Sequence, residues 1–187
     1  MLSLDVDRFL DPICAKNTPE AIFTALMPAL GEQLGCDRTF LYLRSPQHRI
    51  GRVPFCWRRS EGIPEVYDPD WKPEPPSLVK EDPMFAAAVR AEPSIFVDDV
   101  ETASPEVLDP AFEAKTFGHR ALIHAHLRQD GELWGILQPA VFGRPQFWTQ
   151  AEQTLIETTV TRLTPVAIAY VAEHFNPNHF EKASYDR

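Results

Sequence analysis

The chain has 187 residues, which is enough for one domain of ordinary size with a substantial buried core. Hydrophobic residues make up 44% and charged residues 24%, a balance typical of a globular protein rather than a disordered one. The net charge of -9 is opposite to the balance that binds phosphate backbones, so we expect no nucleic-acid partner.

The first third of the chain predicts a helix followed by two strands. The helix is expected from Asn17 to Gly35, because apolar residues recur at every fourth position: Ile22, Leu26, Leu30 and Leu34. The segments RTFLYLR (38–44) and RVPFCWRR (52–59) have the composition of strands. Pro54 lacks the N–H that a sheet ladder needs, which predicts either an edge strand or a bulge at the second segment.

A long segment without regular pattern follows, from Ser60 to Pro83. It is rich in proline and, after Gly62, contains no glycine, so we expect a stiff loop. Ordered loops of this length in compact domains are usually lids or binding loops.

The rest of the chain predicts three helices and three strands that complete one domain. They are a short helix at 82–92, a strand at 94–100, a short helix that ends at Gly118, a hairpin of strands 120–128 and 132–142, and a long helix 149–175. Asp130-Gly131 is a strong hairpin turn, and Thr149 with Glu152 forms a capping box. This order predicts an α+β fold with an antiparallel sheet over residues 1–175 and a polar tail over 176–187.

Two histidines lie in the first hairpin strand, within RALIHAHLRQDGELWGIL (120–137). Alternation places His124 and His126 on one face of this strand. The other face receives small and aliphatic residues, which suit packing against helices: Ala121, Ile123, Ala125 and Leu127. The histidines either line a pocket or lie half exposed with no ligand.

Four segments together resemble the second half of a GAF domain: SIFVDDV (94–100), FGHRALIHAHL (117–127), GELWGIL (131–137) and WTQAEQTLIETTVTRLTPVAIA (148–169). The family's element order extends the resemblance over 18–173, and the likeness is greatest to the light-sensing and stand-alone GAF proteins of cyanobacteria. The resemblance implies N- and C-terminal helices on one sheet face, and short helices with the long loop on the other. It also implies a sensory binding module that forms a homodimer through its first and last helices. We expect a cytoplasmic location, because the N-terminus has no basic region followed by a long apolar core. We do not expect an enzyme, because the sequence contains no G-x-S-x-G, H-E-x-x-H or P-loop motif.

In the family, the pocket lies between one sheet face and the helices and loops above it. By this resemblance, six residues are expected to form a non-covalent ligand site: His124, His126, Trp57, Tyr67, Trp71 and Trp134. The alternative is an interaction scaffold, in which the large aromatic side chains fill the pocket or anchor a partner protein.

Several more specific functions require residues that this sequence does not contain or does not place at the required spacing. Bilin-binding relatives attach the chromophore to a cysteine in the short helix before the hairpin, and VLDPAFEAKTFG (107–118) contains none, so we expect no covalent bilin and no other cofactor. The cysteines Cys14, Cys36 and Cys56 do not form a redox pair, which argues against methionine sulfoxide reduction. A metal on His124 and His126 would need a third ligand, for which the candidates are Asp68, Asp70 and Glu74. Asp-Pro pairs of this kind more often only form turns, so we expect no metal site. We also expect no membrane association, since no apolar run reaches the roughly 18 residues of a membrane span.

Overall fold

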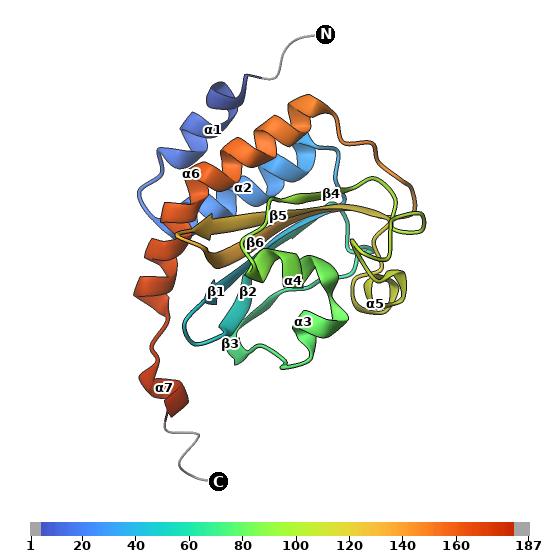
Figure 1. Cartoon of the computed structure of the whole chain (residues 1–187). Helices are drawn as coiled ribbons and strands as arrows, with labels where there is room; N and C mark the ends of the chain where they lie inside the picture. The colour runs from blue at the N-terminus through green and yellow to red at the C-terminus, as the bar shows by residue number, and fades with distance from the viewer. Residues whose placement is uncertain (1–4, 182–187) are drawn as a thin grey trace.

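The computed structural model describes residues 5–181, with the side chain of residue 181 outside the description. One antiparallel sheet has the strand order β3-β2-β1-β6-β5-β4 (Figure 1). The strands are β1 (Arg38–Ser45), β2 (Ile50–Arg58), β3 (Asp68–Pro73), β4 (Ile95–Val97), β5 (Ala121–Gln129) and β6 (Glu132–Val141). The predicted α+β architecture is confirmed.

Helices cover both faces of this sheet (Figure 1). On one face lie α1 (Val6–Cys14), α2 (Pro19–Gln33) and α6 (Gln150–His174). On the other lie α3 (Leu78–Glu81), α4 (Pro83–Val89) and α5 (Pro110–Thr116), and the short α7 (Asn178–Glu181) follows α6. This is the division that the sequence predicted, with the terminal helices on one side and the short helices on the other.

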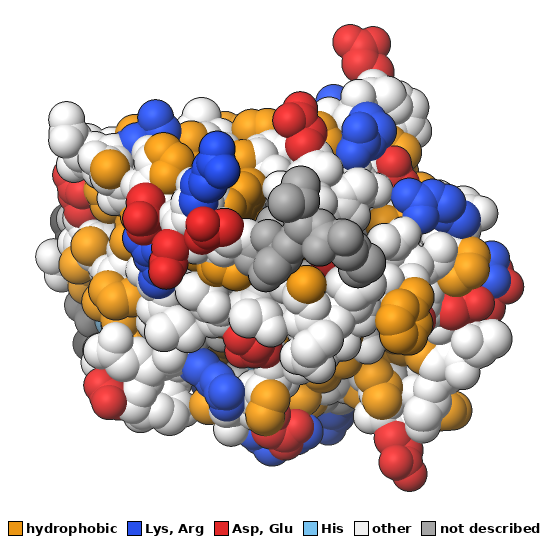
Figure 2. Space-filling model, turned by 90° about the horizontal axis from the view of Figure 1, so that it is seen from above, with side chains coloured by type: hydrophobic (Ala, Val, Ile, Leu, Met, Phe, Trp, Pro, Cys, Tyr) orange, Lys and Arg blue, Asp and Glu red, His pale blue; other side chains and the backbone are white. Residues whose placement is uncertain are grey.

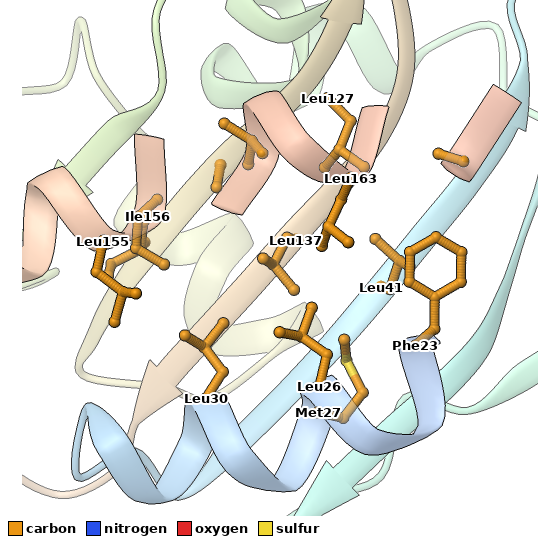
Figure 3. Close-up of a cluster of buried hydrophobic side chains, with 14 of the residues drawn as sticks. Phe23, Leu26, Met27, Leu30, Leu41, Leu127, Leu137, Leu155, Ile156 and Leu163 are labelled. Carbon is orange, nitrogen blue, oxygen red and sulfur yellow. The ribbon is translucent and has the colours of Figure 1, made fainter. Parts of the chain in front are cut away.

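The main hydrophobic core fills the space between the sheet, α2 and α6. Figure 3 shows Leu26 and Leu30 of α2 facing Leu137 of β6, and Leu163 of α6 packs in the same cluster. Ala121, Ile123, Ala125 and Leu127 of β5 all belong to this core and are fully buried. The predicted alternation of β5 is therefore confirmed, because its even-numbered residues must point to the opposite face.

Residues close together in the sequence form the hairpin turn and define where α6 begins. Asp130 and Gly131 both have positive φ (54° and 79°), as the favoured two-residue hairpin turn requires. At the start of α6, the Thr149 hydroxyl accepts from the N–H of Glu152 (3.3 Å), and the Glu152 carboxylate accepts from the N–H of Thr149 (2.8 Å). The expected capping box is formed.

Three details of the fold differ from the sequence-based expectation. The helix α1 was not predicted; it packs on α6, where Arg162 reaches Asp11 (2.9 Å). The loop expected from Ser60 to Pro83 contains both β3 and α3, so β2 is not an edge strand. The other predicted alternative for Pro54 is confirmed: it lies in a bulge, since Leu41 pairs with Phe55 but Leu43 pairs with Arg52. Part of the expected polar tail forms α7, and residues 182–187 lie outside the described residues.

Trp57 packs so closely on α2 that a methyl group at Gly31 would overlap its ring. We expect Gly31→Ala to lower the free energy of unfolding by about 1–3 kcal/mol, because overpacking outweighs the usual gain of alanine in a helix. Urea denaturation measures the effect. Trp57→Leu should rescue most of it in the double variant, while Gly62→Ala, where only Ser60 lies within 4 Å, should change little. A stable Gly31→Ala single variant would contradict this packing.

Candidate functional site

A cavity of about 270 Å³ lies between the sheet and the helices α3, α4 and α5. Its volume is near the lower end of the roughly 300–1,000 Å³ typical of small-molecule sites. Aromatic and aliphatic side chains form most of its lining: Phe40, Tyr42, Val53, Val66, Leu78, Phe85, Phe112, Phe117 and Ile136. The polar lining residues are Asp68, Asp82, Thr116, His124 and Gln138.

Strand register brings two of these polar residues together on the cavity floor. Pairing of β5 with β6 joins Leu122 to Ala140 and Ala125 to Leu137, so His124 lies opposite Gln138. Phe40 of β1 pairs with Gln138 on the other side. The exposed fraction is 3% for His124 and 2% for Gln138, so two adjacent polar groups are buried at the centre of the sheet.

The wall formed by the segment 60–83 is fixed to the sheet by a buried ion pair. Arg44 of β1 contacts Glu74 through Nε–Oε1 (2.5 Å) and Nη2–Oε2 (2.9 Å), and Tyr42 donates its hydroxyl to Oε1 (2.7 Å). A bidentate pair of this kind is among the stronger charged contacts in proteins. The segment places Val66, Asp68 and Leu78 against the cavity, which agrees with the expected loop over the pocket.

Behind the floor, a chain of hydrogen bonds runs from His124 to the backbone. His124 Nδ1 lies 2.8 Å from His126 Nε2, and His126 Nδ1 lies 2.8 Å from the carbonyl oxygen of Glu92. Burial lowers the pKa of both imidazoles, so the neutral forms are favoured. His124 lines the cavity, whereas His126 does not and connects with it through His124.

The structure does not bring the six expected site residues together. Trp57 faces α2, because it lies opposite Thr39 in the register that also directs Phe55 toward the helix-side core. Trp134 packs against the same helix-side core. Trp71 lies at the end of α6, where its indole N–H donates to the carbonyl of His174 (3.0 Å).

Tyr67 is 53% exposed and, with Trp57, lines a second groove of about 330 Å³ near α2. The expectation that the four aromatic residues surround the same pocket as the histidines is therefore wrong. Whether any of the six residues binds a ligand stays a prediction.

Two of the three carboxylates considered as further metal ligands have other partners. Glu74 is held by Arg44, and Asp68 pairs with Lys72 Nζ at 2.7 Å. Among residues 5–181, the group with suitable ligand spacing is Glu20, Glu173 and His174, which lies at the start of α2 and the end of α6 and contains no cavity residue.

Beside the cavity lies a buried polar cluster that the sequence analysis did not anticipate. Glu113 of α5 and His119 are both buried, with His119 Nε2 2.6 Å from Glu113 Oε2. Burial, with a smaller contribution from Asp109, raises the pKa of Glu113 to about 7. Burial, assisted by the positive Arg38, lowers the pKa of His119 to about 3. Burial therefore favours a neutral imidazole and shifts the carboxyl group toward its protonated form.

Two further buried groups adjoin this cluster. Arg38 is fully buried, donates from Nη1 to the carbonyl of Pro64 (2.8 Å) and stacks on Phe142, and burial lowers its pKa to about 10. Within the described part of the chain its Nε and Nη2 have no hydrogen-bond partner. Asp82 caps α4 by accepting from the N–H of Phe85 (3.0 Å), and burial raises its pKa to about 6. A polar residue inside a strongly apolar segment, GILQPAV (135–141), was the sequence signal for Gln138.

Glu113→Gln should make the stability of the protein less sensitive to a rise of the pH from 5 to 8. Since the folded-state pKa of Glu113 is raised from 4.5 to about 7, its stabilising contribution is complete below pH 4.5 and is lost as the pH rises through 7. Glutamine keeps the neutral form, so relative to the native protein the variant should gain roughly 1–3 kcal/mol between pH 5 and pH 8. Urea denaturation at both pH values measures this difference. The exposed control Glu106→Gln should show no such gain, and equal behaviour of the two variants would contradict a buried neutral carboxyl group.

The comparisons with known proteins agree with this architecture. Residues 18–168 match the GAF domain family, and the search of curated proteins gave no match. The structure is similar to the phycoerythrobilin-bound GAF domain from a cyanobacterial phytochrome, with a TM-score of 0.68 and 20% identity over 92% of this chain and 100% of that one. It is also similar to a far-red absorbing dark-state structure with bound biliverdin IXa (TM-score 0.67, 18% identity, 87% and 96% covered).

A third similar structure is the GAF domain from an Acinetobacter phosphoenolpyruvate-protein phosphotransferase, with a TM-score of 0.67 and 12% identity over 91% of this chain and 94% of that one. At identities this low, the structural likeness shows the fold. The family match extends over most of the chain and includes the strands and helices that enclose the cavity. The chain belongs to the GAF domain family.

Proposed function

We propose that this GAF domain is a sensory or regulatory module that binds a small molecule non-covalently between the sheet and α3–α5. The observation that supports this most is the pair of buried polar residues on the cavity floor, His124 and Gln138. Within residues 5–181, the buried Nε2 of Gln138 has no hydrogen-bond partner. The contact of His124 with His126 uses its Nδ1 and leaves its Nε2 for other partners. A buried polar group without a partner costs about 1–3 kcal/mol, so a pocket that is only packed shut is better lined by apolar groups.

The likeness to bilin-bound GAF domains supports a ligand in this general position. The volume of about 270 Å³ favours a molecule of one or two rings over an extended tetrapyrrole. We further propose that no chromophore is attached covalently, because α5 and its flanking residues contain no cysteine. The three cysteines of the chain are free thiols, and Cys56 of β2 lies opposite Phe40 rather than on α5.

A non-catalytic role and a cytoplasmic location are parts of the same proposal. The free thiols fit a reducing compartment. Across residues 5–181, no helix is long and apolar enough to cross a membrane. The buried pairs beside the cavity, such as Glu113 with His119, are shielded from the solvent and fit a structural role better than a catalytic one.

An interaction scaffold is the alternative function, and one observation favours it. The groove beside α2 is lined by exposed Tyr67 together with Trp57, Met27, Pro28 and Pro54. Aromatic side chains in such a position are common anchors for a protein partner.

The ligand proposal predicts that filling the cavity abolishes binding. Ile136 lies on the floor and is 4% exposed, so Ile136→Phe should occupy the space that a ligand needs. Ligand-observed NMR with a library of neutral aromatic fragments should detect binders of the native protein. These should lose binding to Ile136→Phe but not to Val79→Phe, the matched control on the exposed face of α3. Circular dichroism checks that both variants fold. Binding that survives in Ile136→Phe would contradict the proposed site, as would a library without binders.

We also propose a homodimer through the first and last helices, with an interface on their outward faces rather than on their apolar residues that face the sheet. Leu26 and Leu163 are fully buried against the sheet, so their replacement by charged residues would unfold the chain. On the outer face of α1 and α6, hydrophobic side chains are interspersed with acidic and basic ones (Figure 2).

Light scattering should therefore find a dimer of the native protein that Ala169→Glu on α6 dissociates, because Ala169 is exposed on this helix. Ala114→Glu on α5 is exposed on the opposite side of the sheet and should leave the dimer intact. A native protein that remains monomeric at high concentration would argue against the dimer.

A further inference from the structure

The hydrogen-bond chain behind the cavity determines where the protons lie on the two histidines. The carbonyl oxygen of Glu92 can only accept, so the Nδ1 of His126, at 2.8 Å, carries the hydrogen. A neutral imidazole has one N–H, which leaves Nε2 of His126 as an acceptor. His124 Nδ1 lies 2.8 Å from that acceptor and must donate to it. The remaining nitrogen of His124, Nε2, is then a bare acceptor.

The segment that supplies the Glu92 carbonyl is itself fixed to β5. The Ser94 hydroxyl accepts from the backbone N–H of His126 at 3.1 Å, and Arg128 donates to the carbonyl of Ala91. These contacts lie on both sides of Glu92 and hold its carbonyl at the edge of the strand. The proton arrangement is therefore built into the fold rather than left to a rotating side chain.

Burial favours the neutral form of both histidines, which this chain of hydrogen bonds requires. Burial of His124 is the main cause that lowers its pKa well below 6.5, and both His126 and His119 further disfavour a positive charge on it. Burial is also the main cause that lowers the pKa of His126, with Arg128 adding to it and Glu92 opposing it.

The cavity consequently has one acceptor of fixed polarity beside one adaptable group. The carboxamide of Gln138, opposite His124 on β6, offers both an N–H and a C=O and makes no hydrogen bond within residues 5–181. Side chains directly opposite on antiparallel strands have Cβ atoms about 4.5–5.5 Å apart. Adjacent atoms of one small ring can reach both groups at this spacing.

We propose that the cavity selects a neutral, flat heterocycle whose N–H donates to Nε2 of His124 and whose neighbouring carbonyl accepts from Gln138, as in a cyclic amide. This rests on the proposed function, because it names the ligand of the same cavity. Aromatic walls such as Phe40, Phe85 and Phe117 suit a flat ring. An anionic ligand is disfavoured because its lone pairs would face the lone pair of Nε2 of His124. It would also lie near the Asp82 carboxylate, which lines the same cavity.

The proton arrangement can be tested without any ligand. Long-range proton–nitrogen NMR of the full chain with labelled histidine reports which nitrogen of each ring carries the hydrogen. We expect both His124 and His126 to show the Nδ1–H form at pH 7.5. A hydrogen on Nε2 of His124 would overturn the inference whether or not the cavity binds a ligand.

The ligand class is tested with three probes: 2-quinolone, its N-methyl derivative, and the anion 1-naphthoate. For the native protein, 2-quinolone should bind at least tenfold more tightly than either other probe. His126→Leu removes the hydrogen-bond chain without changing a residue that lines the cavity. The ratio of the affinities for 2-quinolone and its N-methyl derivative should therefore fall toward one. The matched control His48→Leu, at an exposed position, should keep the preference. A merely structural role of His126 would weaken both probes equally.

The outcomes separate this inference from the function on which it rests. Equal binding of 2-quinolone and its N-methyl derivative, or tighter binding of the anion, would overturn the inference while leaving a ligand site. Failure of every probe and every aromatic fragment to bind would overturn both.

Discussion

The register of the three central strands, β1, β6 and β5, determines both what the protein buries and what it can bind. One set of alternate residues, such as Leu41, Leu137 and Ala125, packs against α2 and α6. The other set includes Phe40 and Gln138 and forms the cavity floor. Because alternation has a period of two, a slip of one residue would move the polar groups into the helix-side core. Core and site are therefore specified by the same pairing.

The wall and the floor of the cavity differ in how their polar groups are satisfied. In the wall of the cavity, the charge of Glu74 is matched by Arg44 and Tyr42. Gln138 on the floor has no such match within the described residues. Breaking a buried ion pair by removing one partner typically costs 3–5 kcal/mol, so the wall is held firmly. A rigid wall around an unsatisfied floor is the arrangement expected of a preformed binding site, in which little entropy is lost when a ligand binds.

Alternation and turn chemistry were sufficient to predict β5, its helix-facing residues, the hairpin and the capped α6, because each depends on neighbouring residues. The same alternation in RVPFCWRR places Trp57 with Phe55 on the helix side, so its real position could also have been predicted. The helix α1 could also have been predicted, because Asp5 caps its start and the core-facing residues recur at helical spacing: Val6, Phe9, Leu10 and Ile13. The sequence could not reveal β3, which has no alternating pattern and is held by its pairing with β2. Contacts between residues far apart in the chain leave no local periodicity to detect.

The most direct test of the account is methyl NMR of the full chain with labelled isoleucine, leucine, valine and methionine, recorded with a neutral aromatic probe. If the cavity is the binding site, the methyl signals of Val53, Leu78 and Ile136 shift. Those of Leu26 and Leu137 in the helix-side core stay in place. Shifts confined to Met27, beside the groove of Trp57 and Tyr67, would contradict the account and favour that groove as the functional surface.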